Sequence, residues 1–162
     1  MEIIKVIGKP YKENKALENV INYATNMGKT QGYIGGYGVN PCKPDQMIQQ
    51  MYQVKNVYGK ATGYRQLRHY IVSFEPVWEV TADMALHMAY EIARHYMGQY
   101  QICFGVHLDT KQIHIHFVMN TVSYIDGRLY SGSRKELEEL KNHVHNVLRH
   151  NVPALNIMID DL

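Results

Sequence analysis

Three histidines and an asparagine lie between positions 107 and 120, in a stretch where apolar and polar residues alternate. From 113 to 119 every odd position is apolar, whereas His114, His116 and Asn120 occupy even positions. Since successive side chains of a β-strand point to opposite faces, one face is predicted to be core and the other to carry two imidazoles. His107 ends the preceding apolar run, and only residues 108–113 separate it from His114, a length that suits a hairpin loop.

This hairpin would bring His107 beside His114 and His116. Three neutral imidazoles that converge from two adjacent strands make a metal site with open positions for a substrate. A purely structural role would require that neighbouring desolvated rings all find polar partners, so we favour the metal site. Asp109 is interpreted either as a partner that accepts a histidine N–H and fixes its tautomer or as a turn residue of the loop. Isolated histidines elsewhere are interpreted as structural: His69, His87 and His95.

A metal ion on these histidines would polarise an anionic oxygen, but the reaction would still need a nucleophile. Metal-activated water or a side chain can supply it. A tyrosine hydroxyl beside a metal-bound phosphate would form a phosphotyrosyl intermediate, and Tyr23 is one candidate. On periodicity alone, Tyr23 fits better as a tyrosine at the edge of the core, because it borders the apolar stripe of a predicted helix. Tyr33 and Tyr37, in a glycine-rich segment, are alternates.

The elements that would position these residues follow from periodicity and turn signals. Thr81 is expected to cap one helix, and Ser133 with Glu136 to form a capping box on another. The order of elements favours an α+β fold with a central antiparallel sheet flanked by helices. We predict helices at 13–27, 45–57, 81–97 and 133–149, a glycine-rich loop at 30–44, and strands at 1–8, 69–74, 100–107, 113–122, 128–130 and 154–159.

The composition is ordinary for a globular protein. The 162 residues are 46% hydrophobic and 20% charged with a net charge of +2, and they are expected to form a single domain, 1–162. No apolar run approaches the roughly 18 residues of a membrane span, and the N-terminus lacks the apolar region of a signal peptide. Cys42 and Cys103 do not form a CxxC pair. We therefore expect a reduced, cytoplasmic protein without membrane insertion.

Positive charge is concentrated between positions 43 and 69, where one acid, Asp45, stands among basic and aromatic residues. Such alternation suits a groove for single-stranded nucleic acid, with charge for phosphates and rings for bases. A solvated segment whose tyrosines close over the core explains the pattern equally well. The residues concerned are Lys43, Lys55, Lys60, Arg65 and Arg68, interleaved with Tyr52, Tyr58 and Tyr64.

The histidine stretch also has a recognisable signature. His107, Asp109 and Thr110, followed by the His114/His116 pair and Asn120, resemble the His-x-Asp-Thr…His-x-His…Asn motif of conjugative and mobilisation relaxases, the VirD-type, MOBP-like members of the HUH endonucleases. Two further segments support the resemblance. One, at 20–30, holds an apolar helix, Tyr23 and the pair Lys29-Thr30; the other is the Ser-Phe motif at Ser73.

This resemblance implies a fold and a reaction. His114 and His116 would lie on a central strand of an antiparallel sheet. Tyr23 would attack the scissile phosphate at the nick site of a transfer origin, stay linked to the 5′ phosphate and leave a 3′ hydroxyl that can be rejoined. The three histidines would hold a divalent cation, and Asp109 would support them or the activation of the tyrosine.

The resemblance also implies contacts and partners. Ser73 would contact DNA near the nick, and the other DNA-binding candidates are Lys29, Thr30, Asn120, Arg65 and Arg68. The partners would be single-stranded DNA beside a DNA hairpin, an accessory DNA-binding mobilisation protein and a coupling protein, in the bacterial cytoplasm. Imidazoles prefer Mn, Zn or Ni to Mg, so Mn or Mg is expected in use, with Mn the better fit and Zn or Ni in crystals. Relaxases are often longer, so the chain would be a minimal relaxase or an excised nuclease domain.

Two other functions remain open on the sequence. A water-using metallohydrolase or phosphoesterase with the same histidines would cleave without a covalent DNA adduct and would tolerate Tyr23→Phe. A non-enzymatic DNA-binding module with a structural zinc would bind DNA without nicking and would unfold in chelators. The open face of the hairpin argues against a closed structural zinc site.

Overall fold

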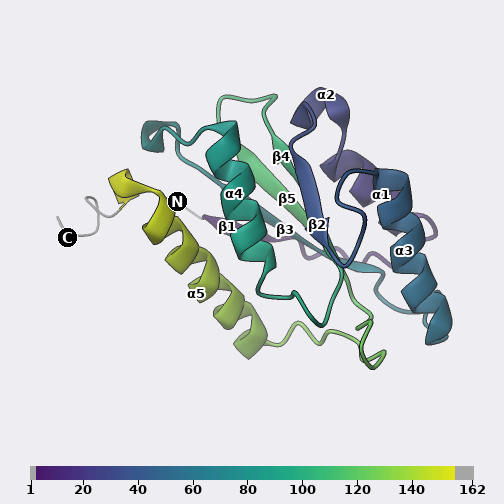
Figure 1. Ribbon diagram of the computed structural model, residues 1–162. Helices are drawn as coiled ribbons and strands as arrows, with labels where there is room; N and C mark the ends of the chain where they lie inside the picture. Colours follow the sequence, from purple (N-terminus) through teal and green to yellow (C-terminus); the bar gives the residue numbers. More distant parts are fainter. Residues whose placement is uncertain (1–2, 156–162) are drawn as a thin grey trace.

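One antiparallel sheet forms the centre of the protein in the computed structural model, which describes residues 3–155. Within that range five strands run in the order β1-β3-β5-β4-β2 (Figure 1). Their bounds are β1 Ile4–Val6, β2 Ile34–Tyr37, β3 Leu67–Ser73, β4 Ile102–His107 and β5 His114–Asn120. The expected α+β fold with a central antiparallel sheet flanked by helices is confirmed, and β5 is the central strand.

Helices cover both faces of this sheet. On one face α4 (Ala82–Ala93) and α5 (Arg134–Asn151) lie side by side, as Figure 1 shows. On the other face α1 (Ala16–Ala24) packs against β4, β5 and α3 (Pro44–Val57). The other helical segments described are α2 (Met27–Thr30), the 3₁₀ turn Pro76–Trp78 and residues 153–155. None of them combines the length and the apolar character that crossing a membrane would require.

Strand register decides which side chains share a face. Paired residues of an antiparallel sheet point to the same side, and His116 is paired with Ile71 on β3 and with Gly105 on β4. His114 is paired with Ser73 and His107. All of these side chains therefore lie on the face that α1 and α3 cover. The alternate residues build the larger core under α4 and α5, among them Tyr70, Val72, Phe104, Ile115 and Phe117.

Both helix caps expected from the sequence are confirmed. The Thr81 side chain accepts a hydrogen bond from the Met84 backbone N–H at 3.2 Å. Ser133 and Glu136 form both hydrogen bonds of a capping box at the start of α5. These short-range signals are local, so the sequence alone is enough to place them.

The glycine-rich segment 30–44 is not all loop, and this prediction is wrong at β2. A Cβ at Gly35 would overlap the hydroxyl of Tyr90 and the ring of Phe104. A Cβ at Gly36 would overlap the carbonyl oxygen of Ile102 on the neighbouring strand. The glycines here permit close packing of an edge strand, which local composition cannot distinguish from a flexible loop.

Other elements also differ from expectation, and the helix predicted at 81–97 ends at Ala93. The helix predicted at 13–27 ends at Ala24, and a separate turn, α2, starts at Met27. The strand predicted at 128–130 is only a single bridge between Val122 and Leu129, and the hydroxyl of the next residue, Tyr130, bonds to that of Tyr96. Residues 153–155 are helical, which contradicts the start of the strand predicted at 154–159; residues 156–159 lie outside the described range.

Candidate metal and nucleophile site

The three histidines of the hairpin meet on the α1 face of the sheet. The ring centroids of His107 and His116 are 4.1 Å apart, and His114 lies 5.1 Å from each of them. One ring nitrogen from each histidine lies within 4.8 Å of the other two. The structure therefore brings these side chains together, as the alternation along the two strands predicted.

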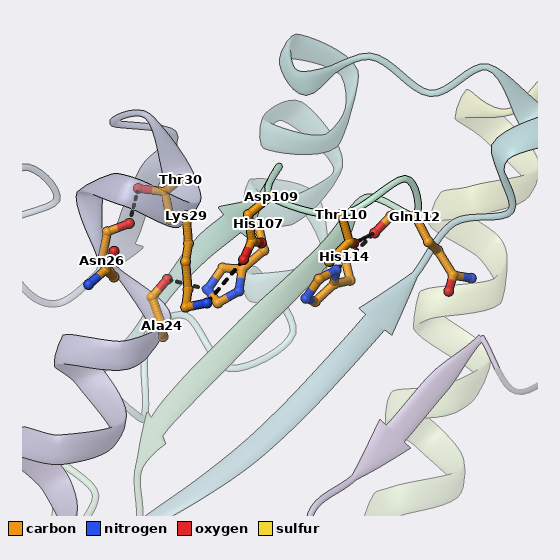
Figure 2. Close-up of polar contacts among 9 residues, drawn as sticks. All are labelled: Ala24, Asn26, Lys29, Thr30, His107, Asp109, Thr110, Gln112 and His114. Atoms are coloured by element: carbon orange, nitrogen blue, oxygen red, sulfur yellow. Dashed lines mark hydrogen bonds and ion pairs between the residues drawn. The ribbon is translucent and has the colours of Figure 1, made fainter.

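Backbone carbonyl groups fix two of the rings. His107 Nε2 donates to the carbonyl oxygen of Ala24 at 3.0 Å, and His114 Nδ1 donates to that of Gln112 at 2.9 Å (Figure 2). Because a carbonyl oxygen only accepts, each of these nitrogens carries the proton. The lone pairs therefore lie on His107 Nδ1 and His114 Nε2. Ala24 ends α1, so His107 also satisfies one of the carbonyl groups that a helix end leaves free.

The residues present fit a divalent metal ion. Within residues 3–155, buried His107 Nδ1 and His116 Nε2 have no hydrogen-bond partner. Burial lowers the pKa of His116 to about 2 and also lowers the pKa of His107. Both rings are therefore neutral near pH 7, the form that coordinates metal. Three imidazole nitrogens that converge in this way are a typical donor set for a transition-metal ion with open positions.

Tyr23 lies directly against the histidine cluster. Its ring centroid is 5.3 Å from that of His107 and 5.2 Å from that of His116, and its side chain is about half exposed. Gly105 makes this approach of α1 possible, because a Cβ at that position would overlap the carbonyl oxygen of Ala24. The end of α1 therefore lies on β4 and carries Tyr23 to the site.

A lysine and an aspartate lie at the edge of the same site. Lys29 Nζ is 3.0 Å from Asp109 Oδ2 (Figure 2). It also lies 5.3 Å from the centroid of the Tyr23 ring. The hydrogen bond between the two side chains lowers the pKa of Asp109 and raises the pKa of Lys29, so both groups are charged. Of the two interpretations of Asp109, the one in which it accepts a histidine N–H is wrong, because Asp109 binds Lys29 while His107 and His114 donate to backbone carbonyl groups.

Comparison with known proteins agrees with this geometry. Residues 23–151 match the family model for relaxases, described as the MobA/VirD2-like nuclease domain. The chain belongs to the relaxase family. Protein rlx from Staphylococcus aureus is 28% identical over 135 residues, 83% of this chain, and a second Protein rlx from the same species is 28% identical over 127 residues, 78% of it. The chain spans only 40% and 37% of these two relatives.

The two alternate tyrosines of this relaxase domain lie away from the histidines. The Tyr37 ring packs on Tyr90 of α4 with centroids 5.4 Å apart. A hydrogen bond to Asp83, also on α4, raises the pKa of Tyr33. Both tyrosines therefore lie toward the face opposite the histidines, and Tyr23 is the candidate that the fold brings to the cluster.

The DNA-binding candidates are placed differently from one another. Ser73 is partly buried beside His114, at the site. The Asn120 side chain is fully buried and accepts a hydrogen bond from Lys55 Nζ at 2.7 Å. Thr30 is also fully buried and donates to the carbonyl oxygen of Asn26 at 3.0 Å. The prediction that Asn120 and Thr30 bind DNA is therefore wrong, because neither side chain is exposed. Strand alternation predicts which face a side chain points to, but not which element packs over that face.

The basic segment 43–69 is mostly engaged within the protein. Arg65 donates to the carbonyl oxygen of Lys9 at 2.6 Å, and Lys60 to that of Gly127 at 2.5 Å. Arg68 points to the α5 face, where it donates to the Ser131 carbonyl oxygen and lies over the ring of Tyr130. These contacts hold the three basic side chains against the protein, and they separate Arg68 from the histidine cluster.

His69, interpreted from the sequence as an isolated structural histidine, belongs to the site. His69 Nε2 lies 2.8 Å from His116 Nδ1, so His69 is part of the histidine cluster and not an isolated structural ring. The signal that could have found it is its spacing on β3, since His69, Ile71 and Ser73 share the face of His116.

Proposed function

We propose that this relaxase domain nicks one strand of DNA at an origin of transfer, with Tyr23 as nucleophile. The observation that best supports this function is the contact of the Tyr23 ring with His107 and His116. Tyr23 is about half exposed, so a bound strand can reach it beside a cluster that can hold a metal ion. The proposed ligand atoms are His107 Nδ1 and His114 Nε2, which are opposite the nitrogens bound to carbonyl groups, and His116 Nε2, which has no hydrogen-bond partner among the described residues.

A divalent ion held by these nitrogens would supply positive charge beside the non-bridging oxygens of the scissile phosphate. Tyr23 Oη forms a bond to phosphorus while the bond from phosphorus to the 3′ oxygen breaks. The phenol gives up one proton, and the leaving 3′ oxygen takes one up. Because the phosphotyrosyl bond retains the energy of a phosphodiester, attack by a 3′ hydroxyl can reverse the step and rejoin the strand.

Lys29 and Asp109 are proposed to assist the tyrosine. The ammonium group of Lys29 lies over the ring that becomes anionic when Tyr23 loses its proton. Asp109 holds Lys29 in that position through the 3.0 Å ion pair. In this proposal Asp109 acts on the activation of the tyrosine and not on the histidines.

The surroundings of Tyr23 have room for DNA. A cavity of about 310 Å³ lies beside Tyr23, with Lys9, Asn19 and His69 among its lining residues. Ser73, next to His114, is proposed to contact the strand near the nick. We propose single-stranded DNA with an adjacent hairpin as the substrate, in the bacterial cytoplasm, with an accessory mobilisation protein and a coupling protein as partners. Mn is proposed as the ion that suits the imidazoles best, with Mg, Zn or Ni as substitutes.

A covalent-adduct assay tests the proposal. The protein is incubated with Mn²⁺ and a random pool of labelled single-stranded DNA, and the products are separated on a denaturing gel. We expect a labelled band that survives denaturation and disappears in Tyr23→Phe and in His116→Ala. Tyr33→Phe is the matched control and should keep the band, since Tyr33 lies toward α4.

Other outcomes support other functions. Cleavage without a band, unchanged in Tyr23→Phe, would support a water-using phosphoesterase. Binding without cleavage, together with unfolding in chelators, would support a DNA-binding module with structural zinc. A band that is lost in Tyr33→Phe and kept in Tyr23→Phe would contradict the assignment of the nucleophile.

A further inference from the structure

A chain of three buried side chains leads away from the metal-binding cluster. His116 Nδ1 lies 2.8 Å from His69 Nε2, and His69 Nδ1 lies 3.0 Å from the hydroxyl of Tyr11. The exposed fractions of Tyr11, His69 and His116 are 5%, 7% and 4%. His107 and His114 are fixed by backbone carbonyl groups, so His116 differs from them in depending on other side chains for its orientation.

The positions of the protons along this chain follow from the need for a metal ligand. For His116 Nε2 to offer a lone pair, Nδ1 must carry the proton and donate it to His69 Nε2. A ring nitrogen that accepts a hydrogen bond carries no proton, so the proton of His69 lies on Nδ1. His69 therefore donates to the Tyr11 oxygen. Burial raises the pKa of Tyr11, so the acceptor is an intact phenol.

The backbone holds Tyr11 in an unusual conformation to make this contact. Its φ angle is +50°, in the left-handed region that residues other than glycine seldom adopt. The Gln66 backbone N–H donates to the Tyr11 carbonyl oxygen at 2.9 Å and thereby fixes the segment beside β3. Such strain persists only where surrounding contacts impose it, and it is concentrated at functional sites.

We propose that His69 and Tyr11 are positioning residues that select the tautomer and the ring orientation in which His116 binds the metal ion. The proposal rests on the metal site of the proposed function but not on Tyr23 or on cleavage. Partners behind a metal-ligating histidine raise its basicity and hold its ring, and their loss typically lowers metal affinity by about 10–100-fold. His69 would act in this way on His116, with Tyr11 holding His69.

Metal binding without DNA tests the proposal. Mn²⁺ affinity is measured by calorimetry on the whole chain, and Co²⁺ is used as a probe whose visible spectrum reports the geometry of its ligands. We expect His69→Leu to weaken Mn²⁺ binding by about 10–100-fold and to change the Co²⁺ spectrum. His69→Gln should restore much of the affinity, because its amide oxygen can accept the proton of His116 Nδ1. Tyr11→Phe should weaken binding by less than about tenfold, since it acts one step further away.

Controls separate this proposal from the others. His87→Leu, an exposed histidine of α4 paired with Glu91, should bind metal like the wild type. Thermal unfolding shows whether each variant folds, and if His69→Leu does not, His69→Gln and Tyr11→Phe carry the test. Equal Mn²⁺ affinity in the wild type and in the folded His69 variants would overturn the proposal, as would a wild type that binds no metal. A missing DNA adduct alongside an intact His69 effect would contradict only the proposed nucleophile.

Discussion

The two faces of the sheet bury different kinds of polar group. Under α4 and α5 a group of phenols is buried within an apolar core, where the Tyr96 hydroxyl bonds to those of Tyr70 and Tyr130. Burial raises the pKa of Tyr70 and Tyr96, so these groups stay neutral. Under α1 and α3 the sheet buries the amine of Lys55 and the imidazoles of His69 and His116. Amines and imidazoles can change charge with pH, and neutral imidazole nitrogens can bind a metal ion.

This difference indicates that one face of the sheet mainly stabilises the fold and that the other carries the candidate binding site. Alternation along β4 and β5 sends every second side chain to the α4 and α5 face, where apolar burial stabilises the fold. The remaining side chains face α1, where His107 Nδ1 and His116 Nε2 have no partner within the described residues and lie beside His114. Isolated unpaired atoms, such as Trp78 Nε1, also occur on the other face, so it is the convergence of several imidazole nitrogens that indicates a binding function.

The largest expected effect compares two neighbours on β5. Phe117 is buried in the α4 and α5 core against Phe104, and Phe117→Ala should lower the free energy of unfolding by about 3–5 kcal/mol. His116→Ala, one residue away on the other face, should cost less, because the lost ring already has one unpaired nitrogen. Urea unfolding with chelator present measures both. Equal losses would show that the two faces support the fold alike.

A second prediction concerns how closely α1 approaches the sheet. Gly105→Ala should reduce adduct formation by about 100-fold, because the added methyl group displaces the end of α1 and with it Tyr23. Gly8→Ala is the matched control, since a Cβ at Gly8 meets no atom within 4 Å. The adduct gel measures both variants. Full adduct formation in Gly105→Ala would mean that Tyr23 does not depend on this contact.

The α3 face should also give the protein an alkaline pH dependence. Burial lowers the pKa of Lys55 to about 8, so the folded protein loses this proton near pH 8 while the unfolded chain keeps it to about 10.5. Between pH 8 and 10 the unfolded state binds more protons, and stability should rise with pH relative to Lys55→Met by up to about 1.4 kcal/mol per pH unit. Urea titrations of both proteins across this range give the difference. Parallel curves would contradict the assignment.

The smallest effect on stability is expected at the rim of the site. Lys29 and Asp109 are each about one-third exposed, so Asp109→Asn should leave unfolding nearly unchanged. In the adduct assay, Lys29→Met and Asp109→Asn should each slow the reaction, and the double variant should be no slower than Lys29→Met, since Asp109 acts through Lys29. Asp126→Asn, in another exposed pair, is the control. Additive losses would separate the roles of Lys29 and Asp109.

Predictions that depend on local sequence pattern were more accurate than predictions that depend on which helix packs over a given face of the sheet. The alternation around His114 and His116 predicted the shared face correctly, because strand geometry is local and has a period of two. The same alternation could not reveal that Asn120 is buried and accepts a hydrogen bond from Lys55 of α3. It also could not reveal that Arg68 lies on the face of α5, where it donates to the Ser131 carbonyl oxygen. It also missed β2, where glycine serves close packing between strands.

The sequence by itself determined the sheet that carries the histidines, the caps of α4 and α5 and the relaxase signature, because each depends on residues close together in the chain. Only the tertiary structure decided which tyrosine reaches the cluster, what Asp109 binds and which side chains stand behind His116. Those contacts join α1, α2 and the segment around Tyr11 to a distant hairpin. They depend on how closely backbones pack, above all at Gly105, and not on any local preference.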